Sequence, residues 1–422
     1  MSKRRGGVTE GVTENRPLSQ NGGVNLAIKT IKDIDVAGKK VFTRVDFNVP
    51  RNEQGAVADD TKIRAALPTI TYLLEQGAAV ILASHLGRPK GKCKEELRLT
   101  AVAEKLQELL KVEVLKSNEV VGPETEALAQ KLQPGQVLLL ENVRFHPGEE
   151  KNDPQLGQAY AKLADLFVSD AFGTAHRAHA SNVGVADYLP AAAGMLMQKE
   201  IENLTQTLHN AKKPVLAIVG GSKTADKIGV IKNFLKLADI ILLGGGMANT
   251  FLKAKGYQLG ISLVEEDQVD NAAQIMREAA DLNVELLLPE DVTVASAIED
   301  TASAETVAAD AVPADKMALD IGPQTCARYA ELIDKAGTVI WNGPLGVFEV
   351  DAFAQGTIAI AKAVAASSAF SLIGGGDVVA AVEKAGVAAQ ISHLSTGGGA
   401  TLEFWEGKEL PGIAVLEDKK EG

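Results

Sequence analysis

The feature that most restricts the fold of this chain is a repeated alternation of short apolar runs with longer helical segments, which starts near Ile28. In the first half the apolar runs are residues 41–45, 78–83, 137–140 and 166–168, and the helical segments are 62–76, 100–110 and 153–163. The apolar runs are rich in β-branched residues, which is typical of strands buried on both faces. We therefore predict a parallel sheet covered by helices.

The second half repeats this alternation, with strands predicted at residues 215–219, 240–243, 284–288, 339–341, 371–373 and 391–394. A chain of 422 residues is too long for one ordinary core, so we predict an α/β protein of two domains. The amphipathic segment 195–210 lies between halves of similar size and is predicted to be a linking helix. The predicted domains are residues 28–194 and 211–406.

Residues 1–27 differ from the rest because they are polar, rich in glycine and partly built on a tandem GVTE repeat. Such a segment buries too little apolar surface to offset the entropy lost on ordering, so we predict a flexible tail.

Composition excludes several classes of partner. A net charge of −12 argues against a nucleic-acid or anionic-membrane surface, and 4% aromatic residues leave few stacking platforms for bases. No apolar run is long enough to span a membrane, and no signal-peptide core follows Met1. Cys93 and Cys326 lie far apart and indicate no disulfide framework, as in a reducing compartment such as the cytoplasm.

Polar and cationic residues follow the predicted strands of the first half. They are Asp46 and Asn48, His85 and Arg88, Arg144, and Arg177. Ligands of parallel sheets collect at the carboxyl ends of the strands, so this grouping indicates a site for a phosphorylated or carboxylated small molecule. Taken singly, each residue has a structural explanation as a turn residue or as the partner of a carboxylate. Arg44 and Arg64 are expected to be structural, because the pattern does not aim them at this place.

In the second half, the segment PVLAIVGGSKTADKIG (214–229) passes from a strand through Gly220 and Gly221 to a predicted helix. Lys223 and Lys227, four residues apart, would then share one helix face at the rim of a phosphate cradle. The alternative is a tight strand-to-helix turn with solvated lysines.

Three further glycine-rich segments follow strands and are predicted to open helices, at 244–246, 374–376 and 397–399, and Gly343 follows another strand. Together they indicate backbone amides around a polyphosphate. Asp377 is suited to bind Mg²⁺ beside phosphate oxygens, and its alternative role is an ordinary helix N-cap. Neither the dinucleotide-binding motif G-x-G-x-x-G nor the phosphate-binding loop motif G-x-x-x-x-G-K-[ST] occurs in these loops. The absence of the first argues against a dehydrogenase.

Eight segments resemble the signature segments of the phosphoglycerate kinase family. They are RVDFNVP (44–50), SHLGRPKG (84–91), ENVRFHPGEEKND (141–153), SDAFGTAHRAHAS (169–181), DKIG (226–229), WNGPLGVFE (341–349), IGGGD (373–377) and STGGGATLEF (395–404). The resemblance runs in order from about Ile28 to the C-terminus. It implies two doubly wound, Rossmann-like parallel-sheet domains that face each other across a cleft and are joined by a helix, with the tail 407–422 packing back on the first domain.

The resemblance also implies an activity, which is reversible phosphoryl transfer from 1,3-bisphosphoglycerate to MgADP, giving 3-phosphoglycerate and MgATP, in a cytoplasmic monomer. By similarity, the substrate is bound by Asp46, Asn48, Lys62, His85, Arg88, Arg144 and Arg177. The nucleotide is bound by Lys223, Lys227, Gly322, Glu349, Gly376, Asp377 and Val378, with Mg²⁺ on Asp377. The residues implied in catalysis are Lys62, Lys223, Gly376 and Gly399.

Two residues depart from the family pattern. Lys62 stands where the family has an arginine that stabilises the transferred group, and Val378 stands where it usually has Ser or Thr. Both departures leave open a second function, a nucleotide- and phosphoglycerate-binding homologue of low turnover with a regulatory or interaction role.

Overall fold

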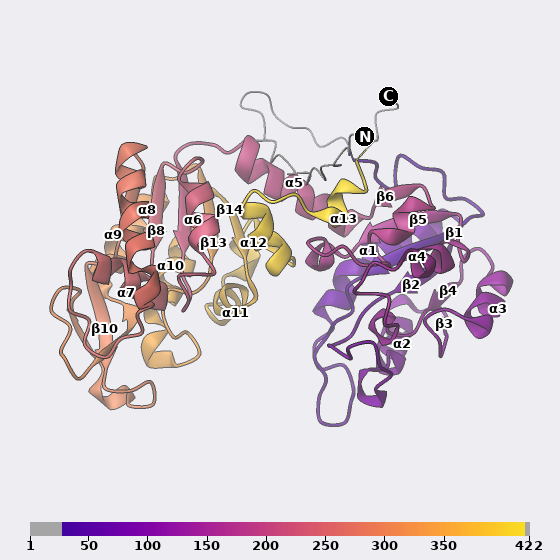
Figure 1. Cartoon of the computed structure of the whole chain (residues 1–422), viewed down its shortest axis with the longest axis horizontal. Coiled ribbons are helices and arrows are strands. Elements are labelled where there is room, and N and C mark those ends of the chain that lie inside the picture. Colours follow the sequence, from indigo (N-terminus) through magenta and orange to yellow (C-terminus); the bar gives the residue numbers. More distant parts are fainter. Residues whose placement is uncertain (1–27, 418–422) are drawn as a thin grey trace, which may run out of the picture.

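Two parallel sheets, each with helices on both faces, form the two lobes of the computed structural model, which describes residues 28–417 (Figure 1). The N-terminal lobe contains β1 (Lys40–Val45), α1 (Thr61–Glu75), β2 (Ala79–Ala83), α2 (Thr100–Leu110), β3 (Val114–Lys116), α3 (Pro123–Lys131), β4 (Val137–Leu139), α4 (Pro154–Ala161), β5 (Leu166–Asp170) and β6 (Ala191–Ala193). Its six strands are parallel, in the order β3-β4-β2-β1-β5-β6. The predicted parallel sheet is confirmed.

Burial on both faces explains why apolar residues occupy consecutive positions in the strands. In β1, Val41 and Val45 pack on the side of α1 and α2, whereas Phe42 packs on the side of α3 and α4. All three side chains are fully buried. Successive residues of a strand point to opposite faces, so a sheet covered on both faces needs apolar residues at consecutive positions.

The C-terminal lobe repeats the arrangement. It contains β7 (Val215–Val219), α6 (Ile228–Phe234), β8 (Ile240–Leu243), α7 (Gly245–Ala254), α8 (Val269–Asp281), β9 (Glu285–Leu287), α9 (Pro323–Asp334), β13 (Thr338–Asn342), α10 (Gln355–Ala366), β14 (Phe370–Gly374), α11 (Gly376–Lys384), β15 (His393–Ser395) and α12 (Gly399–Trp405). Its parallel order is β15-β14-β13-β7-β8-β9. The predicted strand at 391–394 begins two residues later, because Ile391 instead ends the turn of η8 (Ala388–Gln390).

An additional antiparallel sheet was not predicted. It consists of β10 (Asp291–Ala295), β11 (Glu305–Ala308) and β12 (Met317–Ile321), in the order β11-β10-β12. It precedes α9, and its Val292 and Val294 pack in one small cluster with Leu252 of α7 and Leu259.

Both parallel sheets reverse their winding beside the first strand of the lobe. In the N-terminal sheet the chain moves outward from β1 to β2 and beyond, then returns to place β5 on the other side of β1. In the C-terminal sheet β7 has β8 on one side and β13 on the other. Ligands of open α/β sheets bind beyond the strand ends at such switch points, so the topology marks one candidate position in each lobe.

The helix α5 (Met195–His209) joins the two lobes and lies between them in Figure 1. The C-terminal segment crosses back beside it, since the N–H of Gly412 in α13 (Pro411–Ala414) donates to the carbonyl of Ala175 at 2.8 Å. An antiparallel bridge also pairs Ile28 with Glu417. A shared apolar cluster of Phe172, Met197, Trp405, Ile413 and Leu416 therefore connects elements of both lobes. The exact domain boundaries remain a prediction, and the predicted flexible tail lies outside the described residues.

Candidate active site

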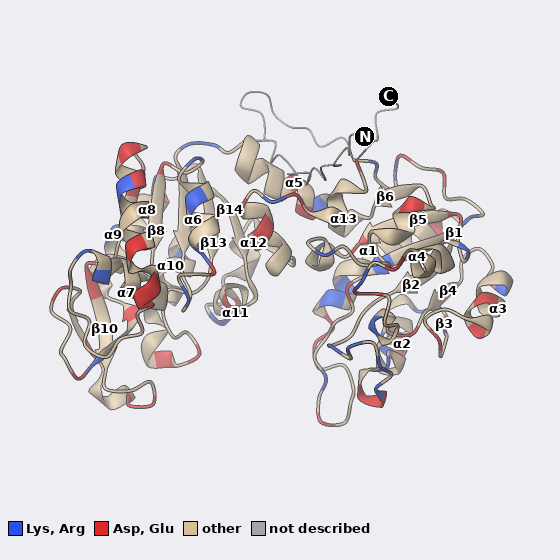
Figure 2. Ribbon diagram, in the orientation of Figure 1, with Lys and Arg blue, Asp and Glu red and all other residues tan. Residues whose placement is uncertain are grey.

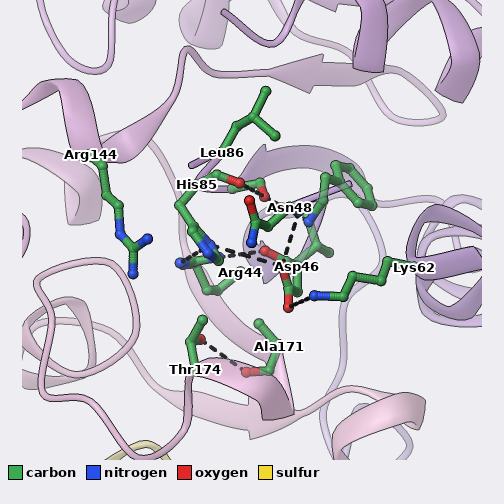
Figure 3. A network of polar contacts seen from close by, with 12 residues as sticks. Arg44, Asp46, Asn48, Lys62, His85, Leu86, Arg144, Ala171 and Thr174 are labelled. Atoms are coloured by element: carbon green, nitrogen blue, oxygen red, sulfur yellow. Dashed lines mark hydrogen bonds and ion pairs between the residues drawn. The ribbon is translucent and has the colours of Figure 1, made fainter. Parts of the chain in front are cut away.

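The carboxylate of Asp46, directly after β1, lies at the centre of a polar cluster in the N-terminal lobe (Figure 3). Its Oδ2 is 2.9 Å from Nζ of Lys62 in the first turn of α1, and its Oδ1 accepts the N–H of Asn48 at 3.0 Å. His85 follows β2, with Nδ1 3.9 Å from Oδ1 of Asp46. The Asn48 side chain accepts the N–H of Gly87 at 2.8 Å, which joins the loops after β1 and β2.

Asn142 holds the loops after β2 and β4 together, and sequence reasoning gave it no role. Its side-chain oxygen accepts the N–H of Leu86 at 3.2 Å and that of Arg144 at 3.1 Å, and its amide donates to the Leu86 carbonyl at 2.7 Å. The side chain is fully buried, so these bonds also satisfy polar atoms that would otherwise be costly to bury. Asn142 thereby fixes where Arg144 leaves the backbone.

Arg144 is a buried cation with donors left over. Its Nη1 donates to the Gly87 carbonyl at 2.8 Å, whereas Nη2 has no hydrogen-bond partner within residues 28–417. Its Nε is 3.3 Å from a carboxylate oxygen of Glu150, but the two groups are not aligned for a hydrogen bond. Burial and the nearby cations Arg177 and Arg44 lower the pKa of Arg144 to about 10. Such a site is suited to an anion, which would satisfy the donors and offset the mutual repulsion of the cations.

Neutral histidines accompany these cations. Burial holds the pKa of His85 well below its usual range, and the charges of Arg44, Arg144 and Lys62 lower it further against the opposing effect of Asp46. Burial and the surrounding arginines lower the pKa of His179 to about 3. The positive charge at this sheet edge therefore belongs to arginine and lysine residues. Figure 2 marks Lys and Arg positions in blue on the ribbon at the start of α1 and along the loop beside α2.

The other predicted substrate residues differ in their contacts. Arg177 follows β5 and donates from Nε to Nε2 of His176 at 3.0 Å. Arg88 is exposed and makes no hydrogen bond or ion pair within the described part of the chain. Arg64 pairs with Asp60 at 2.8 Å on the surface of α1, as expected for a structural residue.

Arg44 was expected to be structural because the pattern did not aim it at this place, yet its side chain reaches the cluster. It is fully buried near the end of β1, and its Nη2 lies 3.4 Å from Nδ1 of His85 (Figure 3). The sequence contained a signal for this, because an arginine inside an otherwise apolar buried strand requires a polar partner.

In the C-terminal lobe, the prediction that Lys223 and Lys227 share a helix face was wrong. Helix α6 begins only at Ile228, so Lys223 lies in the preceding loop and Lys227 at the N-cap position. The carboxylate of Glu265 explains the difference. Its Oε2 accepts the N–H of Thr224 at 2.5 Å and that of Ala225 at 3.0 Å, which holds the segment 222–227 as a loop.

Lys227 reaches from that loop to another strand end. Its Nζ donates to the side-chain oxygen of Asn342, the last residue of β13. The Asn342 amide donates to the carbonyl of Gly374, the last residue of β14, at 2.5 Å. Burial lowers the pKa of Lys227, while the charges of Asp226 and Asp377 oppose this shift. Lys223 is exposed and unpaired among residues 28–417.

Glycine is required in these loops for one of two different reasons. A Cβ at Gly220 would lie 2.2 Å from the Pro344 carbonyl oxygen, and one at Gly322 would lie 2.2 Å from Cγ of Asp291, so these glycines allow close packing of neighbouring segments. A Cβ at Gly376 would meet nothing within 4 Å, and one at Gly399 would only approach His176, at 3.5 Å. Gly376 and Gly399, which begin α11 and α12, therefore leave open space for a ligand.

The first turn of α11 separates two roles. Asp377 is exposed and makes no capping hydrogen bond, so the alternative of an ordinary N-cap does not apply. Val378 is fully buried and packs with Trp341 and Ile373 in the core. Glu349, predicted at the nucleoside site, is exposed. No group of three or more His, Cys, Asp or Glu residues suited to a metal occurs between residues 28 and 417.

Comparison with known proteins shows to which family the chain belongs. The family model of phosphoglycerate kinase matches residues 31–408. The chain is 59% identical over 394 residues to a phosphoglycerate kinase of Moorella thermoacetica, covering 93% of this chain and 100% of that protein. The chain belongs to the phosphoglycerate kinase family.

Solved structures agree with this assignment. Phosphoglycerate kinase from Coxiella burnetii superimposes with a TM-score of 0.85 at 45% identity, covering 92% of this chain and 98% of that one. The enzyme from Pyrococcus horikoshii OT3 gives 0.81 at 35% identity, with the same coverage of both chains. This phosphoglycerate kinase is therefore a glycolytic phosphotransferase with two parallel-sheet α/β domains, as predicted.

Two features of this phosphoglycerate kinase concern the departures in its sequence. The side chain of Lys62 is 38% exposed and bound to Asp46, so a cation is present at the cluster. Val378 has no hydroxyl to offer a ligand and its side chain is buried, but its backbone N–H belongs to the first turn of α11.

No helix within residues 28–417 is both long and apolar enough to cross a membrane.

Proposed function

We propose that this chain catalyses reversible phosphoryl transfer from 1,3-bisphosphoglycerate to MgADP, giving 3-phosphoglycerate and MgATP. The observation that best supports the substrate side is Arg144, a buried guanidinium that retains an unpaired donor beside two other arginines. A phosphate dianion accepts several hydrogen bonds and balances more than one cation, which a neutral ligand would not do.

On this proposal the N-terminal lobe binds the glycerate. Asp46 and Asn48 orient its hydroxyl and carboxyl groups, and His85, Arg88, Arg144 and Arg177 bind the phosphate that is not transferred. The open donors of Arg144 and the exposed side chain of Arg88 support a ligand at this edge. Lys62, released from Asp46 or shared with it, would neutralise the oxygens of the group in transfer.

The chemistry needs cations more than it needs a base. In the direction of ATP consumption the nucleophile is the carboxylate of 3-phosphoglycerate, which is ionised at neutral pH, so no side chain has to remove a proton. His85 is neutral because its pKa is held far below 7 by burial, so it serves as a hydrogen-bonding group. The protein's task is to align the reactants and neutralise charge on the transferred phosphoryl oxygens.

On the nucleotide side we assign the phosphates to Lys223, Lys227 and the backbone amides of Gly376, Val378 and Gly399, and the nucleoside to Gly322 and Glu349. The open space at Gly376 and the free ammonium of Lys223 support this assignment. Asp377 would hold Mg²⁺, which shields the negative charge of the phosphates when bound. A single exposed carboxylate fits this ion, because Mg²⁺ keeps several waters and takes its other ligands from phosphate oxygens.

Substrate and nucleotide groups lie in different lobes, so the reaction requires them to approach. We propose that the lobes close about α5, which joins the two sheets, and about the glycines at 397–399, which lie between β15 and α12. We further propose that the enzyme acts in the cytoplasm as a monomer.

A coupled assay with 3-phosphoglycerate, ATP and Mg²⁺ tests the proposal. We expect turnover that depends on Mg²⁺ and is lost with EDTA, and calorimetric binding of 3-phosphoglycerate that is weakened in Arg144→Ala. Binding of both ligands without turnover would contradict the proposed catalysis and instead favour the low-turnover binding homologue.

A further inference from the structure

A buried chain of polar groups runs beneath the substrate side of the site, from Glu149 through Ser181 to Arg44 and His85. Arg44 donates from Nε to Oγ of Ser181 at 2.7 Å, and Ser181 donates from Oγ to Oε1 of Glu149 at 2.6 Å. At its other end Arg44 brings Nη2 to 3.4 Å from Nδ1 of His85. Glu149, Ser181 and Arg44 are completely buried, and His85 is nearly so.

The available donor protons fix the direction of each hydrogen bond in this series of polar groups. A guanidinium has only donors, so Oγ of Ser181 must accept from Arg44 and can use its own proton only toward Glu149. In its contact with Arg44, Nδ1 of His85 can act only as the acceptor, and the Asp46 carboxylate that also faces this nitrogen is 3.9 Å away, beyond hydrogen-bond distance. A neutral imidazole that accepts at Nδ1 has its proton on Nε2, which makes Nε2 the donor available to a ligand oxygen.

Glu149 is bound firmly enough to act as the fixed end. Its Oε2 accepts the N–H of Ser181 at 3.2 Å and the hydroxyl of Tyr160 at 3.3 Å, and its carbonyl accepts the N–H of Ala180 at 3.0 Å. Burial raises the pKa of Glu149, and the charge of Arg44 opposes that rise. A buried carboxylate and a buried guanidinium joined through one hydroxyl stabilise each other, and loss of either would leave an uncompensated charge.

The contact between Arg44 and His85 is long, so it depends on where the guanidinium is held. Among residues 28–417, the other hydrogen bond of the Arg44 guanidinium goes from Nη1 to the carbonyl of Val45, the next residue of β1. The hydroxyl of Ser181 is thus the group from outside β1 that orients the fork.

We propose that Glu149 and Ser181 are positioning residues that hold Arg44 against His85 and thereby keep the His85 ring proton on Nε2, ready to bind the substrate. The inference rests on the proposed function in one respect, the use of His85 to bind phosphoglycerate. Its structural part, the link from Ser181 to the His85 tautomer, is independent of turnover.

The chain offers a matched pair of variants. Ser181→Ala removes the link between Glu149 and Arg44, with Ser181→Thr as the conservative variant that restores a hydroxyl. Tyr160→Phe removes a hydrogen bond from the same Glu149 carboxylate without touching Arg44, so it controls for a general loosening of this buried region. Glu149→Gln tests the fixed end and retains an acceptor for Ser181.

The first measurement is the tautomer of His85 in ligand-free protein, from ¹⁵N spectra of histidine-labelled enzyme with signals assigned by their loss in His85→Gln. The chain has six histidines, which keeps these spectra simple. We expect the Nε2–H form in the parent, Tyr160→Phe and Ser181→Thr, and a mixture of forms in Ser181→Ala. An unchanged His85 tautomer in both Ser181→Ala and Glu149→Gln would overturn the proposal.

The second measurement is kinetic. We expect the KM for 3-phosphoglycerate to rise about tenfold in Ser181→Ala, the effect of one weakened hydrogen bond to a charged ligand, with the KM for MgATP within about twofold of the parent. A changed tautomer with an unchanged KM for 3-phosphoglycerate would overturn the positioning role. An inactive parent with the Nε2–H tautomer would count against the proposed function and leave the link from Ser181 to His85 supported.

Discussion

The ammonium of Lys62 lies 2.9 Å from Oδ2 of Asp46, so the first turn of α1 is tied to the end of β1 at the substrate side of the site. The family arginine at this position would present a planar fork, whereas lysine offers one compact and strongly hydrated charge. The Lys62–Asp46 pair therefore keeps a cation at this place, but a lysine is aligned less closely with a ligand than an arginine fork would be.

Removing the Lys62 ammonium should cost turnover more than binding. We expect Lys62→Ala to lower kcat on the order of 10²-fold, as loss of an oxyanion-type donor does, and Lys62→Arg to hold or raise kcat with little change in KM. The three proteins are compared at the same Mg²⁺ and salt concentrations. Parent-like turnover of Lys62→Ala would exclude Lys62 from the transition-state contact.

Arg144→Ala should weaken binding of 3-phosphoglycerate by roughly 1.5–3 kcal/mol, because a charge-assisted hydrogen bond to phosphate is lost. Nucleotide affinity should hardly change, since the nucleotide residues belong to the other lobe. Calorimetry with each ligand separately measures this, and Arg64→Ala, which removes an exposed cation paired on α1, serves as the control. Equal losses for both ligands would contradict the assignment of substrate to the N-terminal lobe.

Glu265→Ala should raise the KM for MgATP several-fold, because the loop with Lys223 and Lys227 loses the carboxylate that accepts two of its N–H groups. Glu265→Gln retains an acceptor and should have a smaller effect. The neighbouring exposed Glu266→Ala changes the charge equally without touching the loop and should match the parent. A larger effect on the KM for 3-phosphoglycerate than on that for MgATP would show that this loop does not serve the nucleotide.

Asp170, at the end of β5, should make stability fall as pH rises. Burial raises its pKa from 3.8 to about 7, so between these values the native state holds a proton that the unfolded state has released. Stability contributed by that proton is complete below pH about 4 and is lost as pH rises toward 7, at up to about 1.4 kcal/mol per pH unit.

Asp170→Asn tests this directly. The amide oxygen can still accept the N–H groups of Leu196 and Met197, which Oδ1 of Asp170 accepts at 2.9 and 3.2 Å. Urea unfolding at pH 5, 6, 7 and 8 should show a smaller loss of stability in the variant than in the parent. Asp320, whose pKa burial raises to about 8, is unchanged in both proteins and contributes equally. Parallel pH profiles would contradict the prediction.

Binding of both ligands should shrink the radius of gyration measured by small-angle X-ray scattering more than either ligand alone, because each lobe binds one of them and closure brings the two together. An unchanged scattering profile with both ligands bound would argue against closure about α5.

Several features could be predicted from the sequence because their cause is local. The strands β2, β7 and β8 are continuous apolar runs, which is typical of a sheet covered on both faces. The three glycine-rich segments at 244–246, 374–376 and 397–399 open helices as predicted, since glycine allows the turn from strand to helix. Sequence position also placed Asp46, His85 and Arg144 at one sheet edge.

The short strands could not be predicted in this way. Strand β6 is a run of three alanines and β3 has three residues, so neither contains enough residues to show a period or a β propensity. Their neighbours β5 and β4 decide their conformation by pairing with them.

The sequence by itself determined the two-lobed α/β fold, the family and the chemical types gathered at the strand ends, because these follow from composition, period and motif. The tertiary structure alone decided that Lys223 and Lys227 lie in a loop, since Glu265 is remote in sequence and accepts that loop's N–H groups. It also decided that Arg44 points at His85, since Ser181, which is remote in sequence, accepts from its guanidinium and is itself bound to Glu149. In both cases a buried or partly buried charged group forms hydrogen bonds with a segment that is near it only in the folded structure. The spacing of residues along the sequence therefore does not predict that partner.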